Sequence, residues 1–325
     1  NPLNPNIVGD NYTWNIKADK VISAGANTFN TMSGVSSWVD SNVSAIYNSE
    51  SANSELEKIW RLHKSFVFKG ETSKSSNRNT ALGKIYEGGI IESFIPFDYA
   101  NIVQDQQWVK LSEVTKYSPN GNALEEQDVL DIFSASKFGY DFTQPIIIAQ
   151  NSTYDEIFFE HFEDKIEQGF SNIIYGNAHS GMYSQEIASG TNLLRNVIAR
   201  ELLSTTGGWL KFWVKSDSDL LNPKIVAGAD VYTPELVAKT GEWSLYRTFI
   251  DPSSLSLGNV VDVQLTFDNT IAYIDDIKFN PKESQTTCFV YDVKSLRLLT
   301  LFDDQHFGLY YQYNSEGQLV RKLIE

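Results

Sequence analysis

The stretch from Phe159 to Asp164 places three acidic residues around His161. Acids beside a histidine can perform general acid–base chemistry or ligate a metal ion. In an extended segment, however, side chains alternate between two faces, so His161 and Glu163 share one face and Phe162 lies on the other. We interpret the segment as structural, with a catalytic or metal-binding role as the alternative.

Paired carboxylates occur at Glu125/Glu126, Asp275/Asp276 and Asp303/Asp304. Glycosidases need two acids about 5–10 Å apart in a cleft. Neighbouring residues of a strand point to opposite faces, so these doublets are expected to make poor catalytic pairs. A chain with 41 acids also contains such doublets by coincidence.

Other catalytic signatures are missing from the sequence. It has no Gly-x-Ser-x-Gly elbow, no phosphate-binding loop with its lysine and no His-Glu-x-x-His motif. Cys288 is the single cysteine, so an intrachain disulfide is impossible, and no basic neighbour activates its thiol. We therefore predict no catalytic residues and no enzymatic activity.

Composition and net charge argue against some classes of protein and in favour of others. The net charge is 26 − 41 = −15, which would repel a nucleic-acid backbone and argues against nucleic acid as a partner. A length of 325 residues predicts two or three domains, and an aromatic content of 13% favours β-structure. No apolar run is long enough for a transmembrane helix. The first residues lack a signal peptide's pattern, which predicts a mature form or an excised piece.

The elements that would position these residues are mostly strands. Residues 1–153 are interpreted as a β-rich meander with a Ser/Asn-rich insertion at about 17–58 and a short helix near 54–60. In residues 154–282, the stretches 243–250 and 261–267 alternate strictly between apolar and polar residues. This period of two indicates an antiparallel sheet with one wet face, and several such strands predict a β-sandwich.

Residues 283–325 contain two copies of a short sequence unit. Phe289-Val290-Tyr291-Asp292 recurs as Tyr311-Gln312-Tyr313-Asn314, and a Leu-bearing return follows each copy. We expect two antiparallel hairpins with Tyr291 and Tyr313 in equivalent positions, opening an array that continues beyond this chain. The apolar face of the terminal unit then needs a cover, so this end is expected not to be free in the working state.

This tail resembles the YD (tyrosine–aspartate) repeats of Rhs-like proteins. The resemblance rests on Val290-Tyr291-Asp292 and on the string Tyr313-Asn314-Ser315-Glu316-Gly317-Gln318-Leu319, and Tyr117–Glu125 looks like a divergent copy. The order of several short strings is also similar to large surface or secreted proteins of Bacteroidota; they include Trp60–Phe68, Phe138-Gly139-Tyr140 and Phe162-Glu163-Asp164. The resemblance implies an all-β chain: a β-meander/YD-like N-terminal region, a jelly-roll β-sandwich and the start of a YD-repeat hairpin array.

The 154–282 module also resembles a carbohydrate-binding-type jelly roll. Its markers are Phe162-Glu163-Asp164, Ala178-His179-Ser180-Gly181 and Tyr273-Ile274-Asp275-Asp276. Such modules often hold one structural Ca²⁺, and the resemblance implies Glu163, Ser180 and Asp276 as its ligands. Ca²⁺ prefers six to eight oxygen ligands, and separate segments can supply them. The alternative is that these are ordinary loop acids and a turn.

Exposed aromatic rings could stack on sugars, and Trp209, Tyr232 and Tyr246 are the candidate ligand-binding residues. Trp213 and Trp243 are further candidates but fall within strand patterns, and for any single one of these rings a place in the core is the favoured interpretation. Together these features predict a non-enzymatic scaffold or adhesin-like component of a larger Rhs-like assembly, extracellular or on the cell surface. Its expected partner is a protein at the outer membrane or cell surface, in association with the Bacteroidota secretion machinery. The alternatives are a glycan-binding module that takes polysaccharide, or part of an Rhs-type toxin-encapsulating shell.

Overall fold

The computed structural model describes the following residues: 23–31, 34–35, 38, 58–69, 78–80, 83–85, 91, 94–100, 107–118, 120–164, 173–187, 192–216, 223–227, 230–255, 260–267 and 272–325. This part of the chain is all-β and antiparallel, as the sequence predicts. Its helical elements are short: η3 (Tyr154–Glu156), α3 (Glu201–Thr206) and η4 (Pro252–Ser254). No helix within it has the length and apolarity to cross a membrane. Most of the expected 17–58 insertion and its helix lie outside the described residues.

The chain divides into two compact units, and the boundary falls within β5 (Trp108–Tyr117). The first unit contains residues 1–30 and 60–113. Its strands are β1 (Gly25–Asn30), β2 (Arg61–Phe68), β3 (Arg78–Thr80) and β4 (Gly83–Ile85). β1 pairs with β2, which pairs with β5, and one face of this sheet buries an aromatic cluster of Phe66, Phe68 and Trp108.

The second unit contains residues 31–59 and 114–325 and holds the remaining strands. Its meander sheet runs in the order β5-β6-β7-β8-β20-β21-β22-β23. The bounds are β6 (Ala123–Asp128), β7 (Phe133–Gly139), β8 (Gln144–Gln150), β20 (Gln285–Tyr291), β21 (Leu298–Phe302), β22 (Gly308–Tyr313) and β23 (Leu319–Ile324). Because β20 pairs with β8, the meander resumes after an excursion of more than 130 residues (150 to 285).

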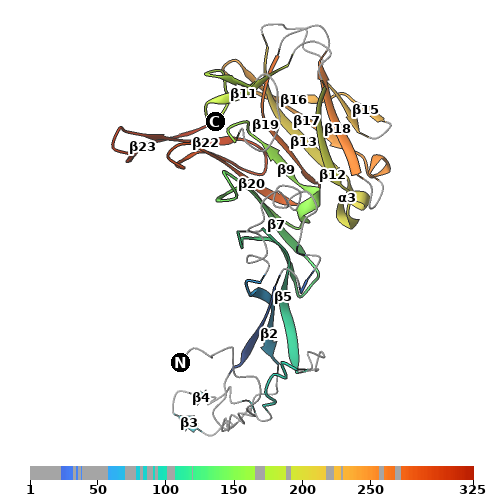
Figure 1. The fold of residues 1–325 in the computed structure, drawn as a ribbon, viewed down its shortest axis with the longest axis vertical. Helices are drawn as coiled ribbons and strands as arrows, with labels where there is room; N and C mark the ends of the chain where they lie inside the picture. Colours follow the sequence, from blue (N-terminus) through green and yellow to red (C-terminus); the bar gives the residue numbers. More distant parts are fainter. Residues whose placement is uncertain are drawn as a thin grey trace. The chain divides into compact units, whose positions relative to one another are not determined.

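The excursion between β8 and β20 is a β-sandwich (Figure 1). One sheet has the order β10-β11-β19-β13-β17-β16, with β9 also paired to β19, and the other has the order β12-β18-β14-β15. The bounds in the first sheet are β9 (Phe158–Glu160), β10 (Ile173–Tyr175), β11 (Tyr183–Ile187), β13 (Gly208–Lys215), β16 (Glu235–Thr240), β17 (Trp243–Ile250) and β19 (Ala272–Pro281). Those in the second are β12 (Asn192–Ile198), β14 (Pro223–Ala227), β15 (Asp230–Tyr232) and β18 (Val260–Phe267).

Alternation in β13 explains how the sandwich packs. Leu210, Phe212 and Val214 point inward and share one buried cluster with Ile225 and Ala227 of the opposite sheet. The residues between them point to the outer face, as the period of two requires. The inner face of β13 is thus buried against the second sheet, but Lys211 and Trp213 on its outer face are buried as well, so this strand has no wet face at those positions.

The hairpin loops of the meander repeat one geometry. In each of four loops, the N–H of the first residue donates to the carbonyl oxygen four residues later, at 2.8–3.1 Å. The fourth residue of each loop has a positive φ, which is the turn-plus-bulge geometry of short hairpins. The first and fourth residues are Ser118 and Gly121, Asp128 and Asp131, Asp303 and His306, and Asn314 and Gly317.

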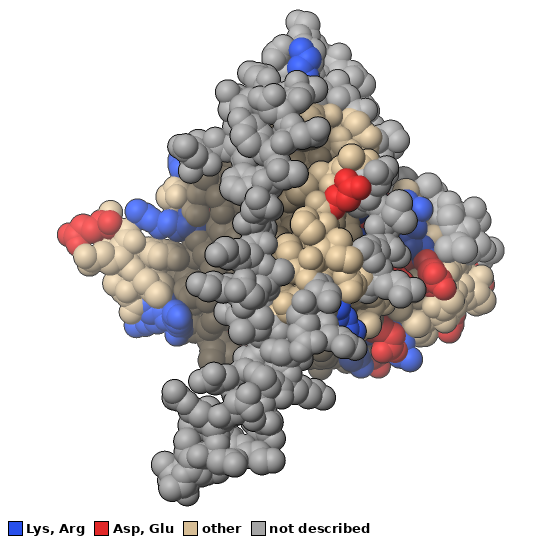
Figure 2. All heavy atoms as spheres, turned by 90° about the horizontal axis from the view of Figure 1, so that it is seen from below, with Lys and Arg blue, Asp and Glu red and all other residues tan. Residues whose placement is uncertain are grey.

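Residues 288–325 form two successive hairpins, β20–β21 and β22–β23. Tyr291 and Tyr313 occupy equivalent positions, each at the end of a strand and directly before an Asp or Asn that opens the loop. The second hairpin projects from the second unit, and Figure 2 shows Lys and Arg side chains on both of its flanks.

Candidate functional site

Two adjacent aspartates of β19 face the same turn. Asp275 Oδ2 accepts the N–H groups of His179 and Ser180 at 2.8 and 3.3 Å. Asp276 Oδ1 accepts the Ser180 hydroxyl at 2.7 Å, and its Oδ2 lies 2.8 Å from His179 Nδ1. The expectation that this doublet diverges to opposite faces is therefore wrong.

A β-bulge explains the convergence. The register of β19 on β13 shifts between Lys211 and Trp213, so β19 has extra length there. Asp276 lies at this point with φ 50, a left-handed backbone that is uncommon for residues other than glycine. The bulge interrupts the alternation of the strand and allows both carboxylates to reach one turn.

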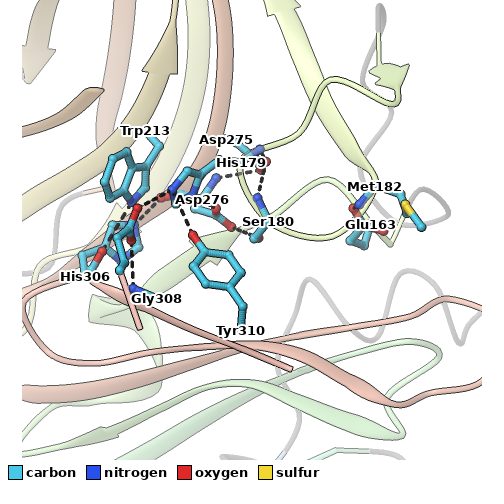
Figure 3. A network of polar contacts seen from close by, with 11 residues as sticks. Glu163, His179, Ser180, Met182, Trp213, Asp275, Asp276, His306, Gly308 and Tyr310 are labelled. Carbon is cyan, nitrogen blue, oxygen red and sulfur yellow. Dashed lines mark hydrogen bonds and ion pairs between the residues drawn. The ribbon is translucent and has the colours of Figure 1, made fainter. Parts of the chain in front are cut away.

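His179 lies between two carboxylates (Figure 3). Its Nδ1 contacts Asp276, and its Nε2 lies 3.0 Å from Glu325 Oε1 and 3.1 Å from the Tyr310 hydroxyl. The ring stacks on Trp213 at a centroid distance of 4.0 Å and an interplanar angle of 16°. The imidazole thus joins β19 of the sandwich to the end of the tail hairpin.

Burial, hydrogen bonds and neighbouring charges together shift the pKa values of the residues in this network. Burial alone would lower the pKa of His179, but the hydrogen bonds and charges of Asp276 and Glu325 outweigh it and raise the pKa. When the ring is protonated, both of its nitrogens can donate to the two carboxylates. Burial, together with the charge of Asp276, raises the pKa of Asp275 well above its ordinary value.

Serine, histidine and aspartate meet here, but not in the order that nucleophilic catalysis requires. A catalytic serine donates to the histidine, which a carboxylate orients from its other nitrogen. Ser180 instead donates to Asp276, and the far nitrogen of His179 contacts Glu325. The exposed fraction of the His179, Asp276 and Glu325 side chains is 3%, 0% and 1%. The geometry supports a structural connection between strands.

Glu163 binds the backbone of Met182 and Tyr183, which follow Ser180 in the same loop. Its Oε1 accepts the N–H groups of Met182 and Tyr183 at 2.6 and 2.7 Å. Its Oε2 is buried without a hydrogen-bond partner. Burial raises the pKa of Glu163 to about 7, against the two N–H bonds that lower it. Gly181, with φ +63, allows the loop to pass, because a Cβ there would overlap the Glu163 carboxylate.

The three residues expected to bind calcium therefore surround one loop. Ser180 and Asp276 are in direct contact, and Glu163 holds the residues that follow Ser180. Their oxygens mostly accept protein hydrogen bonds, and among the described residues no three His, Cys, Asp or Glu side chains are arranged to hold a metal ion. This arrangement does not fit a Ca²⁺ cage as it stands, and calcium stays a prediction of the resemblance.

The aromatic candidates for ligand binding lie apart. Tyr246 pairs with Phe212 across β17 and β13, stacks on it at 5.9 Å and packs against the sandwich core. Tyr232 also packs against this core, and its hydroxyl lies 2.6 Å from Ser254 Oγ. Trp209 is three residues from Phe212 and faces the outer surface, where it remains half-buried. The three rings do not form one platform.

The His161 cluster is packed into the protein. Burial lowers the pKa of His161 to about 3, and its ring stacks on Tyr140 at 5.6 Å. Glu160 accepts the N–H of Phe162 at 3.0 Å, and Asp164 accepts that of Tyr140. These carboxylates accept backbone N–H groups and the imidazole packs against an aromatic ring, which is what the structural interpretation predicts.

Two buried lysines form a second connection that the sequence analysis missed. Lys278 Nζ donates to Thr286 Oγ1 at 3.0 Å and to the carbonyl oxygens of Asp303 and Asp304 at 3.1 and 2.9 Å. Lys211 Nζ donates to the same Asp304 carbonyl at 2.6 Å. Burial lowers the pKa of Lys211 to about 8. Lys211 and Lys278 are polar residues of strands, and nothing in the local sequence indicates that a distant loop buries them.

A cavity of about 600 Å³ lies between the meander and α3. Lys116 and Arg200 both contact Asp155 in its wall, at 2.8 and 2.6 Å. The buried Glu156 accepts the N–H groups of Arg200 and Leu203. No motif in the sequence indicated this cavity.

Comparisons with known proteins identify no relative. The chain matches no protein-family model and no curated protein. Among solved structures, one described as the structure of the infectious bursal disease virus Gt strain aligns with a TM-score of 0.23 and 8% sequence identity. The alignment covers 79% of this chain and 50% of that chain, so this chain spans half of its length. Similarity at this level carries no conclusion about fold or function.

Proposed function

We propose that this protein is a non-enzymatic scaffold or adhesin-like component of an extracellular or cell-surface assembly. The observation that carries the proposal is that the buried residues capable of chemistry form hydrogen bonds between elements of the chain. His179 contacts Glu325, and Lys278 contacts the β21–β22 loop, so both tie the sandwich to the tail hairpins. Buried groups that only hold elements together favour a mechanical role over a catalytic one.

The resemblance to Rhs-like surface proteins of Bacteroidota supports the finer parts of the proposal. In it, the sandwich is a carbohydrate-binding-type jelly roll, and the hairpins that end with Tyr291 and Tyr313 are YD-like repeats. The shared loop geometry of the meander is what a repeated hairpin unit would produce. The partner would be a protein at the outer membrane or cell surface.

Surface labelling and activity screening test this proposal together. A membrane-impermeant biotin reagent applied to intact cells that express the protein should label it, while a cytosolic marker stays unlabelled. The purified chain should turn over no glycan, ester or peptide substrate. An unlabelled chain, or turnover that disappears in a Glu163→Gln or His161→Ala variant, would contradict the proposal.

Glycan binding is the second candidate, and Trp209 is the observation that favours it. Its half-buried ring lies beside Phe249 at 5.0 Å and under the Arg247 guanidinium at 4.9 Å, on the outer face of the sandwich. An aromatic face next to polar donors can stack on a sugar ring. A polysaccharide found on a glycan array should lose about tenfold in affinity with Trp209→Ala and keep it with Tyr246→Phe. Equal losses would contradict a platform at Trp209.

A further inference from the structure

The loop between β6 and β7 carries large apolar side chains that are exposed to solvent. The exposed fractions are 51% for Val129, 73% for Leu130 and 42% for Ile132. Asp128 holds the loop in one shape, because its Oδ1 accepts the N–H groups of Leu130 and Ile132 at 2.7 and 2.9 Å. An ordered turn therefore presents these side chains, which reduces the entropy that binding a partner would cost.

The geometry of the turn does not require these apolar residues. Val129 and Leu130 are the second and third residues of one of the four meander loops that share a hydrogen bond and a positive φ. In the other three loops, no Val, Leu or Ile occupies these positions; they are Pro119 and Asn120, Asp304 and Gln305, and Ser315 and Glu316. Adjacent exposed apolar side chains that neither the core nor the turn needs indicate an interaction surface.

The same loop forms one wall of the cavity between the meander and α3. Asp131, Ile132 and Phe133, which directly follow Leu130, line this cavity of about 600 Å³, and so does Leu202 of α3. The volume lies within the range of about 300–1,000 Å³ that is typical of ligand pockets. The apolar tip of the loop therefore adjoins a cavity that is large enough to take a side chain of a partner.

The lining of the cavity is acidic. It includes two cations and five acids, which give a formal charge of 2 − 5 = −3. Both cations, Lys116 and Arg200, contact Asp155, at 2.8 and 2.6 Å. The exposed carboxylates of Asp131 and Glu201 form no hydrogen bond or ion pair with the residues that the structure describes. A cation that enters the cavity would meet these carboxylates without a competing charge on them.

A basic side chain of a partner protein accounts for this surface better than two other occupants. A small organic cation inside the cavity would leave Val129 and Leu130 in contact with water. A second copy of this chain carries the same net charge of −15, which opposes association. Lysine and arginine have an apolar stem that can pack on Ile132, Phe133 and Leu202, and a charged head for the acids.

We propose that the β6–β7 loop and the adjoining cavity bind a segment of a partner protein that carries a lysine or arginine next to a large apolar residue. The basic side chain enters the cavity and meets the carboxylates of Asp131 and Glu201, and the apolar residue packs on Val129 and Leu130. Charge complementarity selects a basic segment, and the apolar contact supplies affinity. This inference rests on the proposed scaffold function and names the chemistry of its partner.

Selection from a library of random peptides displayed on phage tests the inference on the full chain. We expect the enriched peptides to share a lysine or arginine next to a large apolar residue. Fluorescence anisotropy then measures the affinity of an enriched peptide for variants of the chain. The affinity should fall about tenfold in Leu130→Ser and about tenfold in the double variant Asp131→Asn with Glu201→Gln. Asparagine tolerates the left-handed backbone of Asp131, with φ 61, so the double variant keeps the shape of the loop.

Two variants elsewhere in the chain serve as matched controls. Val293→Ser removes an apolar side chain that is 47% exposed in the loop between β20 and β21. Asp141→Asn with Glu316→Gln removes two exposed charges, one of them at a residue that is also left-handed, with φ 57. Neither control should change the affinity for the peptide.

Enriched peptides with a basic and an apolar neighbour, whose binding depends on Leu130 and on the two acids, support the inference. Enrichment of peptides without a basic residue, no enrichment at all, or equal losses in the controls overturns it. Binding of argininamide as tightly as the peptide also overturns it, and so does self-association in sedimentation velocity that Leu130→Ser abolishes. Surface labelling and the substrate screen do not depend on this loop, so failure of peptide binding is distinguishable from failure of the scaffold function.

Discussion

The phenolic oxygen of Tyr140 lies 2.9 Å from both the backbone nitrogen and the carbonyl oxygen of Tyr291, which is 151 residues further along the chain. The hydroxyl accepts from the N–H and donates to the C=O, so it satisfies both backbone groups at the end of β20. Tyr140, which follows β7 in the first part of the meander, is thus hydrogen-bonded to β20, the first strand of the meander after the sandwich.

Tyr140→Phe should lower the free energy of unfolding by about 1–3 kcal/mol, because two buried backbone groups lose their partner. Urea denaturation of the purified chain measures this. Tyr175→Phe, at a tyrosine that is 67% exposed, is the matched control and should change little. A loss no larger than that of the control would mean that water replaces the hydroxyl.

Lys278→Met should also destabilise the fold by about 1–3 kcal/mol. The substitution keeps most of the side-chain volume but leaves the Asp303 and Asp304 carbonyl oxygens without this donor. Lys239→Met, on the exposed strand β16, is the control. If Lys278→Met proves as stable as the control, the lysine does not hold the tail loop to the sandwich.

Gly181→Ala should destabilise more than Gly176→Ala. Both glycines have positive φ, so both alanines carry the left-handed backbone cost of about 1–2 kcal/mol. A Cβ at position 181 would additionally overlap the Glu163 carboxylate, whereas nothing lies within 4 Å at position 176. Thermal unfolding of the two variants isolates that contact. Equal melting temperatures would show that Glu163 moves aside freely.

The contribution of Glu163 to stability should fall as pH rises from about 4.5 to about 7, whereas buried His161, with its pKa lowered to about 3, contributes in the opposite direction. Burial raises the pKa of Glu163 in the folded state to about 7 from 4.5, so the folded chain holds a proton that the unfolded chain releases. Its stabilising effect is complete below pH 4.5 and is lost as pH rises through 7, by about 3 kcal/mol in total. The unfolding free energy of Glu163→Gln relative to the unaltered chain should therefore rise with pH across this window, and Glu126→Gln, at an exposed residue of β6, should show no such trend.

Calcium should stabilise the protein if the resemblance to carbohydrate-binding jelly rolls holds. A hundredfold excess over the dissociation constant would add about 2.7 kcal/mol by mass action. Binding requires the Glu163 and Asp276 oxygens to exchange protein hydrogen bonds for the ion, so Glu163→Gln and Asp276→Asn should remove the effect. A melting curve that neither Ca²⁺ nor EDTA shifts would end the calcium hypothesis.

Much of the secondary structure follows from local sequence. The alternation in 243–250 and 261–267 predicts β17 and β18 closely, and the Tyr-Asp and Tyr-Asn copies predict the hairpins of β20–β23. Tyr117-Ser118 and Tyr313-Asn314 indeed open loops of the same geometry. Periodicity and turn chemistry are properties of a few neighbouring residues, so a sequence can report them.

Tertiary structure alone decided the pairing of β20 with β8, the bulge at Asp276 and the burial of Lys278. Each depends on contacts between residues far apart in the chain. Alternation predicted that Asp275 and Asp276 would diverge, and a one-residue change of register against β13 made them converge on His179 and Ser180. Register is set by the free energy of packing whole strands together, which no local pattern contains.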